Sequence, residues 1–182
     1  MSEYSSKNLF HKQKYSNLAL IGMSGVGKSY WSKKMENNGF RRYGCDDLIA
    51  ERLGFKIGSK VNSTLNLANW MGLPYSEGYL AAESLYLEVE EEVMTFICDE
   101  LENCTKNDKP IVLDTTGSLI YLKNSILKRL RKLFRTIHLN LPIKKQKELF
   151  ESYLLEPKPV IWKGVYHPNE NENQKKTLRR CY

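Results

Sequence analysis

Short apolar runs alternate along the chain with longer stretches in which apolar residues recur at helical spacing. Four runs are predicted to be β-strands: Leu18–Ile21, Phe40–Cys45, Lys109–Asp114 and Thr136–Leu141. No run approaches the roughly 18 apolar residues that a membrane-spanning helix needs. The pattern therefore predicts a sheet of several short strands.

Helices are predicted between and after these strands. They cover Lys28 to about Asn38, Leu48–Leu53 with Gly54 as its end, a short segment within Ser59–Pro74, Ser76–Asn103, Leu119–Phe134, and a stretch from Pro142 through Leu154. In the longest helix one apolar stripe contains Ala82, Leu85, Val89, Val93, Phe96, Ile97 and Leu101, and the glutamates Glu88, Glu90, Glu91 and Glu92 are expected on its solvated face. Strands alternating with helices predict an α/β domain with a doubly wound parallel sheet.

A glycine-rich segment, residues 22–29, joins the first strand to the first helix. Its sequence, Gly22-Met23-Ser24-Gly25-Val26-Gly27-Lys28-Ser29, fits the pattern G-x-x-x-x-G-K-[ST] in the strand–loop–helix context that this pattern requires. Glycines let backbone N–H groups approach phosphate oxygens, and the start of the helix adds free N–H groups and the positive end of its dipole. The segment, called the glycine loop below, therefore predicts a nucleotide phosphate site.

Within the glycine loop, Lys28 is expected to reach the β- and γ-phosphates of ATP, and the Ser29 hydroxyl to bind Mg²⁺. The residues predicted to hold the nucleotide are Gly22, Ser24, Gly25, Val26, Gly27, Lys28, Ser29 and Tyr30. The side chains of Tyr30, Trp31 and Met35 have helical spacing and are expected in the core.

Carboxylates follow the second and third predicted strands, where ligands gather in a parallel sheet. Asp46 is assigned to orienting or deprotonating an acceptor hydroxyl, and Asp47 to capping the next helix, although a cap is a possible role for either. Asp114 is a candidate Mg²⁺ ligand, directly or through water. Thr116 and Gly117 are candidates for the acceptor site, the alternative being a helix entry capped by Thr116 or Ser118.

Composition adds little to the prediction of fold and function. A length of 182 residues favours one domain, expected over residues 17–182 after a flexible arm at 1–16. The net charge of +7 suits a nucleotide, an anionic substrate or a nucleic acid. The basic helix around Arg129 is expected to be a solvated face, which makes a nucleic-acid partner unlikely. Four cysteines without C-x-x-C spacing, and no secretory segment, favour a cytoplasmic protein, and no feature predicts its oligomeric state.

Over residues 17–162 the sequence resembles the shikimate kinase family and its small-molecule kinase relatives. The glycine loop, the segment Cys45-Asp46-Asp47-Leu48-Ile49-Ala50-Glu51-Arg52-Leu53-Gly54 and the segment Ile111-Val112-Leu113-Asp114-Thr115-Thr116-Gly117-Ser118 carry the resemblance. It implies a P-loop NTPase-type, three-layer α/β/α fold of the nucleoside-monophosphate-kinase and shikimate-kinase kind. It also implies a phosphotransferase that uses ATP and Mg²⁺, with a basic side chain closing over the transferring phosphoryl group.

The chain departs from the family pattern in the acceptor site. Gly44 stands at the first acidic position, and Tyr79-Leu80 stands where the family has its substrate-clamping arginine. Of the family's triple glycine only Gly117 remains, and Lys158 replaces the lid arginine. No apolar strand follows Trp162, so the family's last strand and helix are expected to be missing or divergent.

These observations predict a kinase that acts on a hydroxyl of a small molecule, with a divergent acceptor site. Lys28, Asp46 and Lys158 are its expected catalytic residues, and Ser29 and Asp114 its metal site. The alternatives are a nucleoside or nucleotide kinase on the same scaffold, or a non-catalytic nucleotide-binding protein with an RNA or protein partner.

Overall fold

The computed structural model describes residues 17–58, 61–103 and 109–182, and within these ranges it contains four strands, seven α-helices and one 3-10 helix. The strands are β1 (Leu18–Ile21), β2 (Arg41–Gly44), β3 (Ile111–Asp114) and β4 (Arg135–His138). The helices are α1 (Lys28–Glu36), α2 (Cys45–Ile57), α3 (Thr64–Met71), α4 (Tyr79–Glu102), η1 (Gly117–Tyr121, the 3-10 helix), α5 (Asn124–Leu133), α6 (Ile143–Leu155) and α7 (Gln174–Cys181). The expected arm at residues 1–16 lies outside the described residues.

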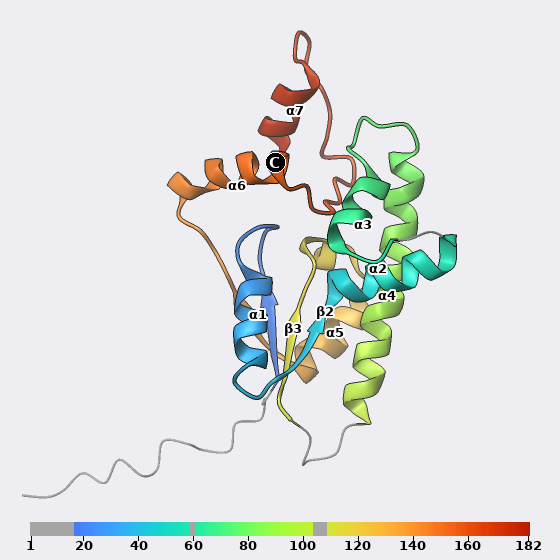
Figure 1. The fold of residues 1–182 in the computed structure, drawn as a ribbon, viewed down its shortest axis with the longest axis vertical. Helices are drawn as coiled ribbons and strands as arrows, with labels where there is room; N and C mark the ends of the chain where they lie inside the picture. Colours follow the sequence, from blue (N-terminus) through green and yellow to red (C-terminus); the bar gives the residue numbers. More distant parts are fainter. Residues whose placement is uncertain (1–16, 59–60, 104–108) are drawn as a thin grey trace, which may run out of the picture.

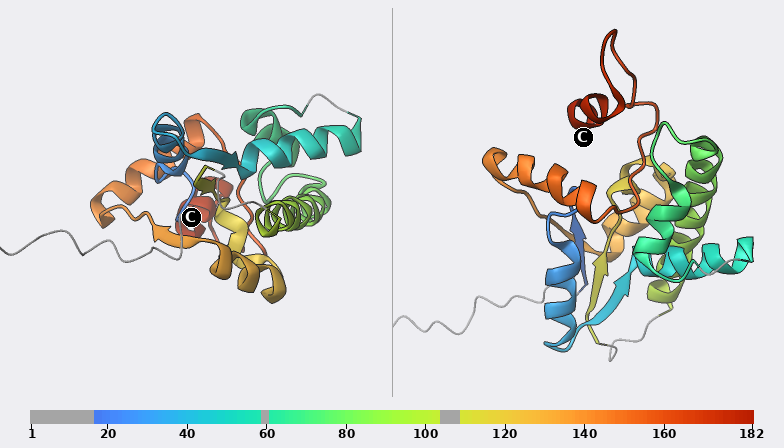
Figure 2. Two further views of the ribbon diagram at one scale, coloured as in Figure 1. Left: turned by 90° about the horizontal axis from the view of Figure 1, so that it is seen from below. Right: turned by 45° about the horizontal axis from the view of Figure 1, so that its top comes forward.

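The strands form one parallel sheet in the order β2-β3-β1-β4. The connection after β1 leads by way of α1 to β2, and the connection after β3 leads by way of α5 to β4, on the other side of β1. The neighbouring strands β1 and β3 therefore mark the point where the order reverses, which is where open parallel sheets bind ligands. Helices cover both faces of the sheet, with α1 and α5 on opposite sides (Figures 1 and 2). This confirms the predicted α/β fold with a parallel central sheet.

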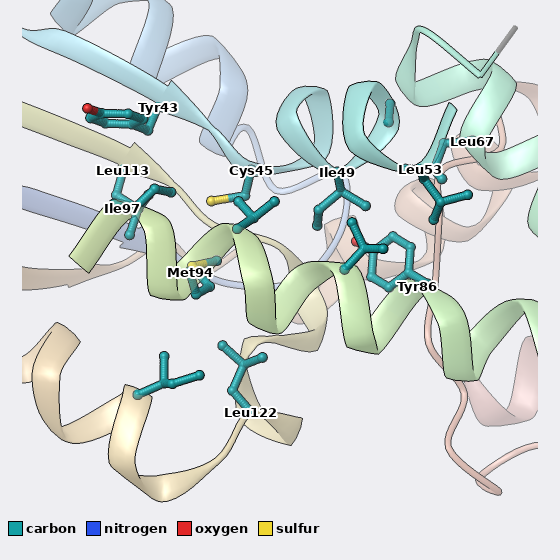
Figure 3. Packing of buried hydrophobic residues seen from close by; sticks show 14 of the residues in the cluster. Tyr43, Cys45, Ile49, Leu53, Leu67, Tyr86, Met94, Ile97, Leu113 and Leu122 are labelled. Atoms are coloured by element: carbon teal, nitrogen blue, oxygen red, sulfur yellow. The ribbon is translucent and has the colours of Figure 1, made fainter. Parts of the chain in front are cut away.

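The core lies mainly between the sheet, α2, α4 and α5. Along α4 the side chains of Val93, Met94 and Ile97 are fully buried, and Figure 3 shows Met94 and Ile97 beside Leu113 of β3. The expected stripe is confirmed at Val89, Val93, Ile97 and Leu101, which are buried. It is wrong at Phe96, which is 39% exposed under the guanidinium of Arg52.

Several helix ends differ from their predicted positions. In two cases the reason is the backbone conformation of a glycine. Helix α2 continues through the buried Gly54 and ends at Gly58, which has the left-handed φ of 63° typical of a residue after a helix. Helix α4 begins at Tyr79 because Gly78 has a φ of 80°, which no helical residue can adopt. The predicted helix Leu119–Phe134 is divided, and its first part is the 3-10 turn η1.

The segment after β4 lies across the carboxyl ends of the strands (Figure 1). Helix α6 begins after Pro142, as predicted, and residues 156–166, which we call the strap, lead toward α7. Within the described residues no strand follows β4, and α7 was not predicted. No helix in the described ranges is long and apolar enough to cross a membrane.

Candidate functional site

The glycine loop lies at the carboxyl end of β1, at the reversal point of the sheet (Figure 1). Its backbone requires glycine at Gly22, where φ is 144° and a Cβ atom would lie 2.4 Å from the Leu139 carbonyl oxygen. Gly27, with φ 100°, occupies the position before α1, so the first N–H groups of that helix open toward the loop. The loop therefore has the form and helix terminus of an anion-binding site.

Lys28 is buried inside this loop, with only 7% of its surface exposed. Its Nζ atom donates hydrogen bonds to the carbonyl oxygens of Gly22 at 2.8 Å and Met23 at 2.9 Å. Burial lowers the pKa of the Lys28 ammonium, and attraction to Asp46 and Asp114 opposes that shift. The ammonium is thus bound to the loop carbonyls and attracted by two carboxylates.

The next three residues of α1 are exposed. Ser29 is exposed on the first turn, beside the end of the loop. Tyr30 is 64% exposed and Trp31 is 44% exposed, and their rings meet edge to face at 5.4 Å. The prediction that these aromatic side chains belong to the core is therefore wrong, because the buried face of α1 is formed by Lys28 and Ser32.

Asp114 ends β3 and is the centre of a hydrogen-bond network. Its Oδ2 atom accepts from the Ser32 hydroxyl at 3.0 Å and from Nη2 of Arg42 at 2.9 Å. Arg42 also donates through Nε to the Ser32 oxygen at 2.9 Å and through Nη1 to Asp47 at 3.2 Å. A guanidinium therefore already neutralises much of the carboxylate that the sequence analysis assigned to Mg²⁺.

Gly44 makes room for this guanidinium. A Cβ atom at residue 44 would lie 2.6 Å from Nη2 of Arg42 and 2.6 Å from Oδ2 of Asp47. The expected cap role of Asp47 is wrong, because α2 begins at Cys45 and its N-terminus has no side-chain cap. Asp47 instead pairs with Arg42 from the first turn of the helix.

A magnesium ion fits this site only with ligands supplied by a nucleotide and water. No cluster of three or more His, Cys, Asp or Glu side chains that could hold a metal occurs among the described residues. The exposed Ser29 hydroxyl can provide one oxygen. The hydrogen bonds from Ser32 and Arg42 both go to Oδ2 of Asp114, so Oδ1 suits contact through water. Mg²⁺ retains several waters and binds few carboxylates, so this donor set is compatible with it.

Asp46 occupies the first turn of α2, on the side that faces Lys28. Its Oδ1 atom accepts a hydrogen bond from the Tyr86 hydroxyl of α4 at 3.2 Å. Burial raises the pKa of Asp46 to about 6, while the charge of Lys28 and the Tyr86 hydrogen bond act in the opposite direction. A carboxylate of this kind can accept a proton near neutral pH.

Glu90 of α4 lies fully buried beneath the loop that follows β3. It accepts hydrogen bonds from the Thr116 hydroxyl and, at 2.7 Å, from the Ser118 hydroxyl. Burial raises the pKa of Glu90 to about 7. The expectation that this glutamate belongs to a solvated face is wrong, and neither Thr116 nor Ser118 caps a helix through its side chain.

The strap is fixed to α4 by two buried side chains. Glu83 accepts from the backbone N–H groups of Trp162 at 2.9 Å and Lys163 at 2.8 Å. The Tyr79 hydroxyl donates to Glu83 and contacts the Val160 carbonyl oxygen at 3.0 Å. Tyr79 therefore fixes the strap, whereas Leu80, its neighbour, is exposed.

Two small pockets flank the glycine loop and share Ser24 and Tyr182. One of about 130 Å³ includes Gly25, Tyr153 and the exposed Lys158. The other, of about 210 Å³, contains Gly117 and Ser118 and is covered by the strap.

The structure thus gathers most of the predicted site residues at one edge of the sheet. Lys28, Asp46 and Asp114 interact electrostatically, Lys158 lies on one side of the loop, and Gly117 lies on the other. His138 is exposed at the end of β4. On the basic helix α5, Arg129 forms ion pairs with Asp99 at 2.5 Å and with Glu102 at 2.8 Å. The Arg129 guanidinium is therefore already paired with acidic residues of α4.

Sequence reasoning missed Arg42, Glu83 and Glu90. Position 90 shares the α4 face of Tyr86, Val93 and Met94, so helical periodicity could have placed it inside. Alternation along β2 could have placed Arg42 opposite the buried Tyr43, on the α1 side.

Comparison with known proteins identifies no family: no protein-family model matches the chain, and no curated protein matches it either.

Proposed function

We propose that this protein is a cytoplasmic ATP- and Mg²⁺-dependent phosphotransferase, built on a P-loop NTPase-type scaffold, that phosphorylates a hydroxyl of a small molecule. The observation that carries the proposal is the position of Lys28. Its buried ammonium lies under a glycine loop at a helix N-terminus, between the charges of Asp46 and Asp114. A binding loop needs the lysine alone, whereas transfer to a hydroxyl also needs a base such as Asp46.

In the proposed reaction the acceptor oxygen attacks the γ-phosphorus of ATP. The bond between that phosphorus and the β,γ-bridging oxygen breaks, ADP leaves with the bonding electrons, and the hydroxyl proton passes to the Asp46 carboxylate. The loop N–H groups and Lys28 stabilise the charge on the phosphate oxygens. Mg²⁺, held by Ser29 and through water by Asp114, would neutralise the β- and γ-phosphates.

Other residues have supporting roles. Lys158, a strap residue that lines the pocket of about 130 Å³ beside the glycine loop, supplies a mobile cation over the transferring group. Arg42 holds Asp114 in place from β2. The free thiols of Cys45, Cys98 and Cys181, among the described residues, support a reducing compartment.

The test is nucleotide binding and turnover by the Lys28→Met variant, which keeps an unbranched side chain in the buried position. We expect MgATP affinity, measured by calorimetry, to fall by about 10- to 100-fold, since a charged hydrogen bond contributes roughly 1.5–3 kcal/mol. Turnover, measured as ADP release with an acceptor panel, should fall by a factor on the order of 100 or more.

Lys33→Met provides the matched control, because Lys33 lies on the same helix with its side chain exposed. It should bind and turn over like the wild type. Unchanged MgATP binding in Lys28→Met would contradict the proposed phosphate site. Binding that depends on Lys28, with no turnover on any acceptor, would favour the non-catalytic nucleotide-binding alternative.

A further inference from the structure

The pocket of about 210 Å³ lies beside the glycine loop and includes Gly117, a predicted acceptor-site residue. Met23 and Ser24 of the loop form one wall, and Gly117 and Ser118, which follow β3, form another. The strap closes the pocket from above with residues 159–162. Ligand pockets commonly measure roughly 300–1,000 Å³, so this one suits a small ligand.

The walls of this pocket are aromatic and aliphatic. Tyr121 comes from η1, Trp162 from the strap and Tyr182 from the end of α7, and Val160 and Ile161 lie between them. The Trp162 and Tyr182 rings pack against each other with their centroids 6.4 Å apart. Rings of this kind stack on flat, apolar ligands.

No side chain that lines the pocket in the described part of the chain carries a charge. In the family pattern an arginine would follow the Glu77-Gly78 turn. Tyr79 stands there instead, and its hydroxyl is engaged with Glu83 and the Val160 carbonyl. A carboxylate placed here would lose its hydration without gaining a counter-ion, which is strongly unfavourable. The pocket is therefore suited to uncharged molecules.

The polar group at the base of the pocket connects it to the buried carboxylates. The Ser118 hydroxyl donates to Glu90 at 2.7 Å, so its oxygen can accept a hydrogen bond from a ligand hydroxyl. Tyr86 contacts Asp46 from the adjoining turn of α4. A hydroxyl-bearing ligand would thus meet uncharged hydrogen-bonding groups, the Ser118 hydroxyl among them, beside the aromatic and aliphatic walls.

From this lining we infer that the pocket binds an uncharged, ring-bearing alcohol, of which a nucleoside is the simplest example, as the phosphoryl acceptor. The inference rests on the proposed function and selects the acceptor class for the same site. Carboxylated alcohols such as shikimate and gluconate are excluded as good acceptors by the absence of a cation in the described lining.

Calorimetry on the full chain, with the donor site filled by a non-hydrolysable ATP analogue and Mg²⁺, tests the inference. The probes are uridine and thymidine as uncharged ring alcohols, and shikimate and gluconate as carboxylated alcohols. We expect at least ten-fold tighter binding of one of the nucleosides than of either acid. Tighter binding of an acid, or no binding of the nucleosides, would overturn the inference.

Two pocket variants and a control make the result specific. Tyr121→Ala should weaken nucleoside binding by about 10-fold, since base–aromatic stacking contributes roughly 1–3 kcal/mol. Val165→Arg places a cation at a lining residue that is 46% exposed, and should improve shikimate binding by about 10-fold. Ile120→Ala, at the exposed neighbour of Tyr121 outside this pocket, should leave both affinities unchanged.

The two proposals fail in different ways. If MgATP binding depends on Lys28 while the acids bind better than the nucleosides, the acceptor class is wrong and the phosphate site stands. If MgATP does not bind at all, the proposed function fails and the acceptor assignment falls with it. If Val165→Arg leaves shikimate binding unchanged and Tyr121→Ala leaves nucleoside binding unchanged, the pocket is not the acceptor site.

Discussion

Adjacent aspartates show how position alone decides the chemistry of a side chain. Asp46 lies against Tyr86 and near Lys28, and its burial raises its pKa to about 6. Asp47, one residue later, is exposed and pairs with Arg42. Asp46 is therefore poised to exchange a proton near neutral pH, which supports its assignment as the base.

A pH profile of kcat/KM tests this assignment. We expect the rate to rise with pH through an acidic limb near pH 6, because the base must be ionised in the free enzyme. Tyr86→Phe removes the hydrogen bond that favours the ionised form, so the limb should move to higher pH. A profile without a limb between pH 5 and 7, or one that Tyr86→Phe does not shift, would rule out Asp46 as the base.

At the scale of residues, the sequence predicted the groups whose role is local and missed those whose role depends on a distant partner. Lys28 belongs to a continuous motif, and its position followed from that motif. Arg42 meets Asp114 across 72 positions of the chain, and Glu90 meets Ser118 across 28. Only the strand order and the rotation of α4 reveal those contacts.

At the scale of elements, the glycine loop depends on a close backbone approach at Gly22. Gly22→Ala should abolish measurable MgATP binding, because its Cβ would collide with the Leu139 carbonyl and displace the loop. Gly39→Ala is a matched control, since Gly39 also has a positive φ of 96° but has no atom within 4 Å of a built Cβ. It should cost only about 1 kcal/mol of unfolding free energy and leave binding intact.

Calorimetric titration with MgATP and urea unfolding of both variants provide the measurement. If Gly22→Ala and Gly39→Ala weaken MgATP binding equally, general backbone strain explains the loss and the close approach does not.

The ends of elements were harder to predict than their existence. The sequence indicated every strand and most helices, because apolar spacing is a strong local signal. It did not distinguish Gly54, which packs inside α2, from Gly58, which ends it with a left-handed φ. Both residues are glycines beside apolar residues, and only the contact of α2 with the core decides between them.

At the scale of the whole molecule, the buried Glu90 links protonation to stability. Its pKa is raised from the usual 4.5 to about 7 in the folded protein, so the folded state favours the protonated form. This contribution is fully present below pH 4.5 and is lost as the pH rises through 7, with a size on the order of 3 kcal/mol.

Glu90→Gln removes this titration. We expect the unfolding free energy of the wild type, measured by urea denaturation, to decrease between pH 5 and 8 by more than that of the variant. Glu88→Gln is the control, because the Glu88 side chain is 63% exposed and its change should leave the wild-type pH dependence in place. Equal pH dependence in Glu90→Gln and the wild type would show that Glu90 does not titrate in this range.

The alternation of strands and helices predicted the layered α/β fold, but it did not predict the strap and α7. The strap is an irregular segment that depends on single anchors, such as Glu83 bound to the Trp162 and Lys163 backbone, and α7 is polar in sequence. Anchors of this kind leave no periodic pattern. The pocket that the strap covers was consequently beyond prediction from the sequence.

The room that Gly44 leaves for Arg42 has a consequence for how this site can change over time. Because a Cβ at residue 44 would lie 2.6 Å from the Arg42 guanidinium, positions 42 and 44 are epistatic. An acidic residue at position 44 is compatible with the β2 terminus only after the arginine has been lost or turned away. Losing the arginine first leaves Asp114 with the Ser32 hydrogen bond but without its charged partner. Mutational paths between this arrangement and one with an acid at position 44 therefore pass through a less stable intermediate.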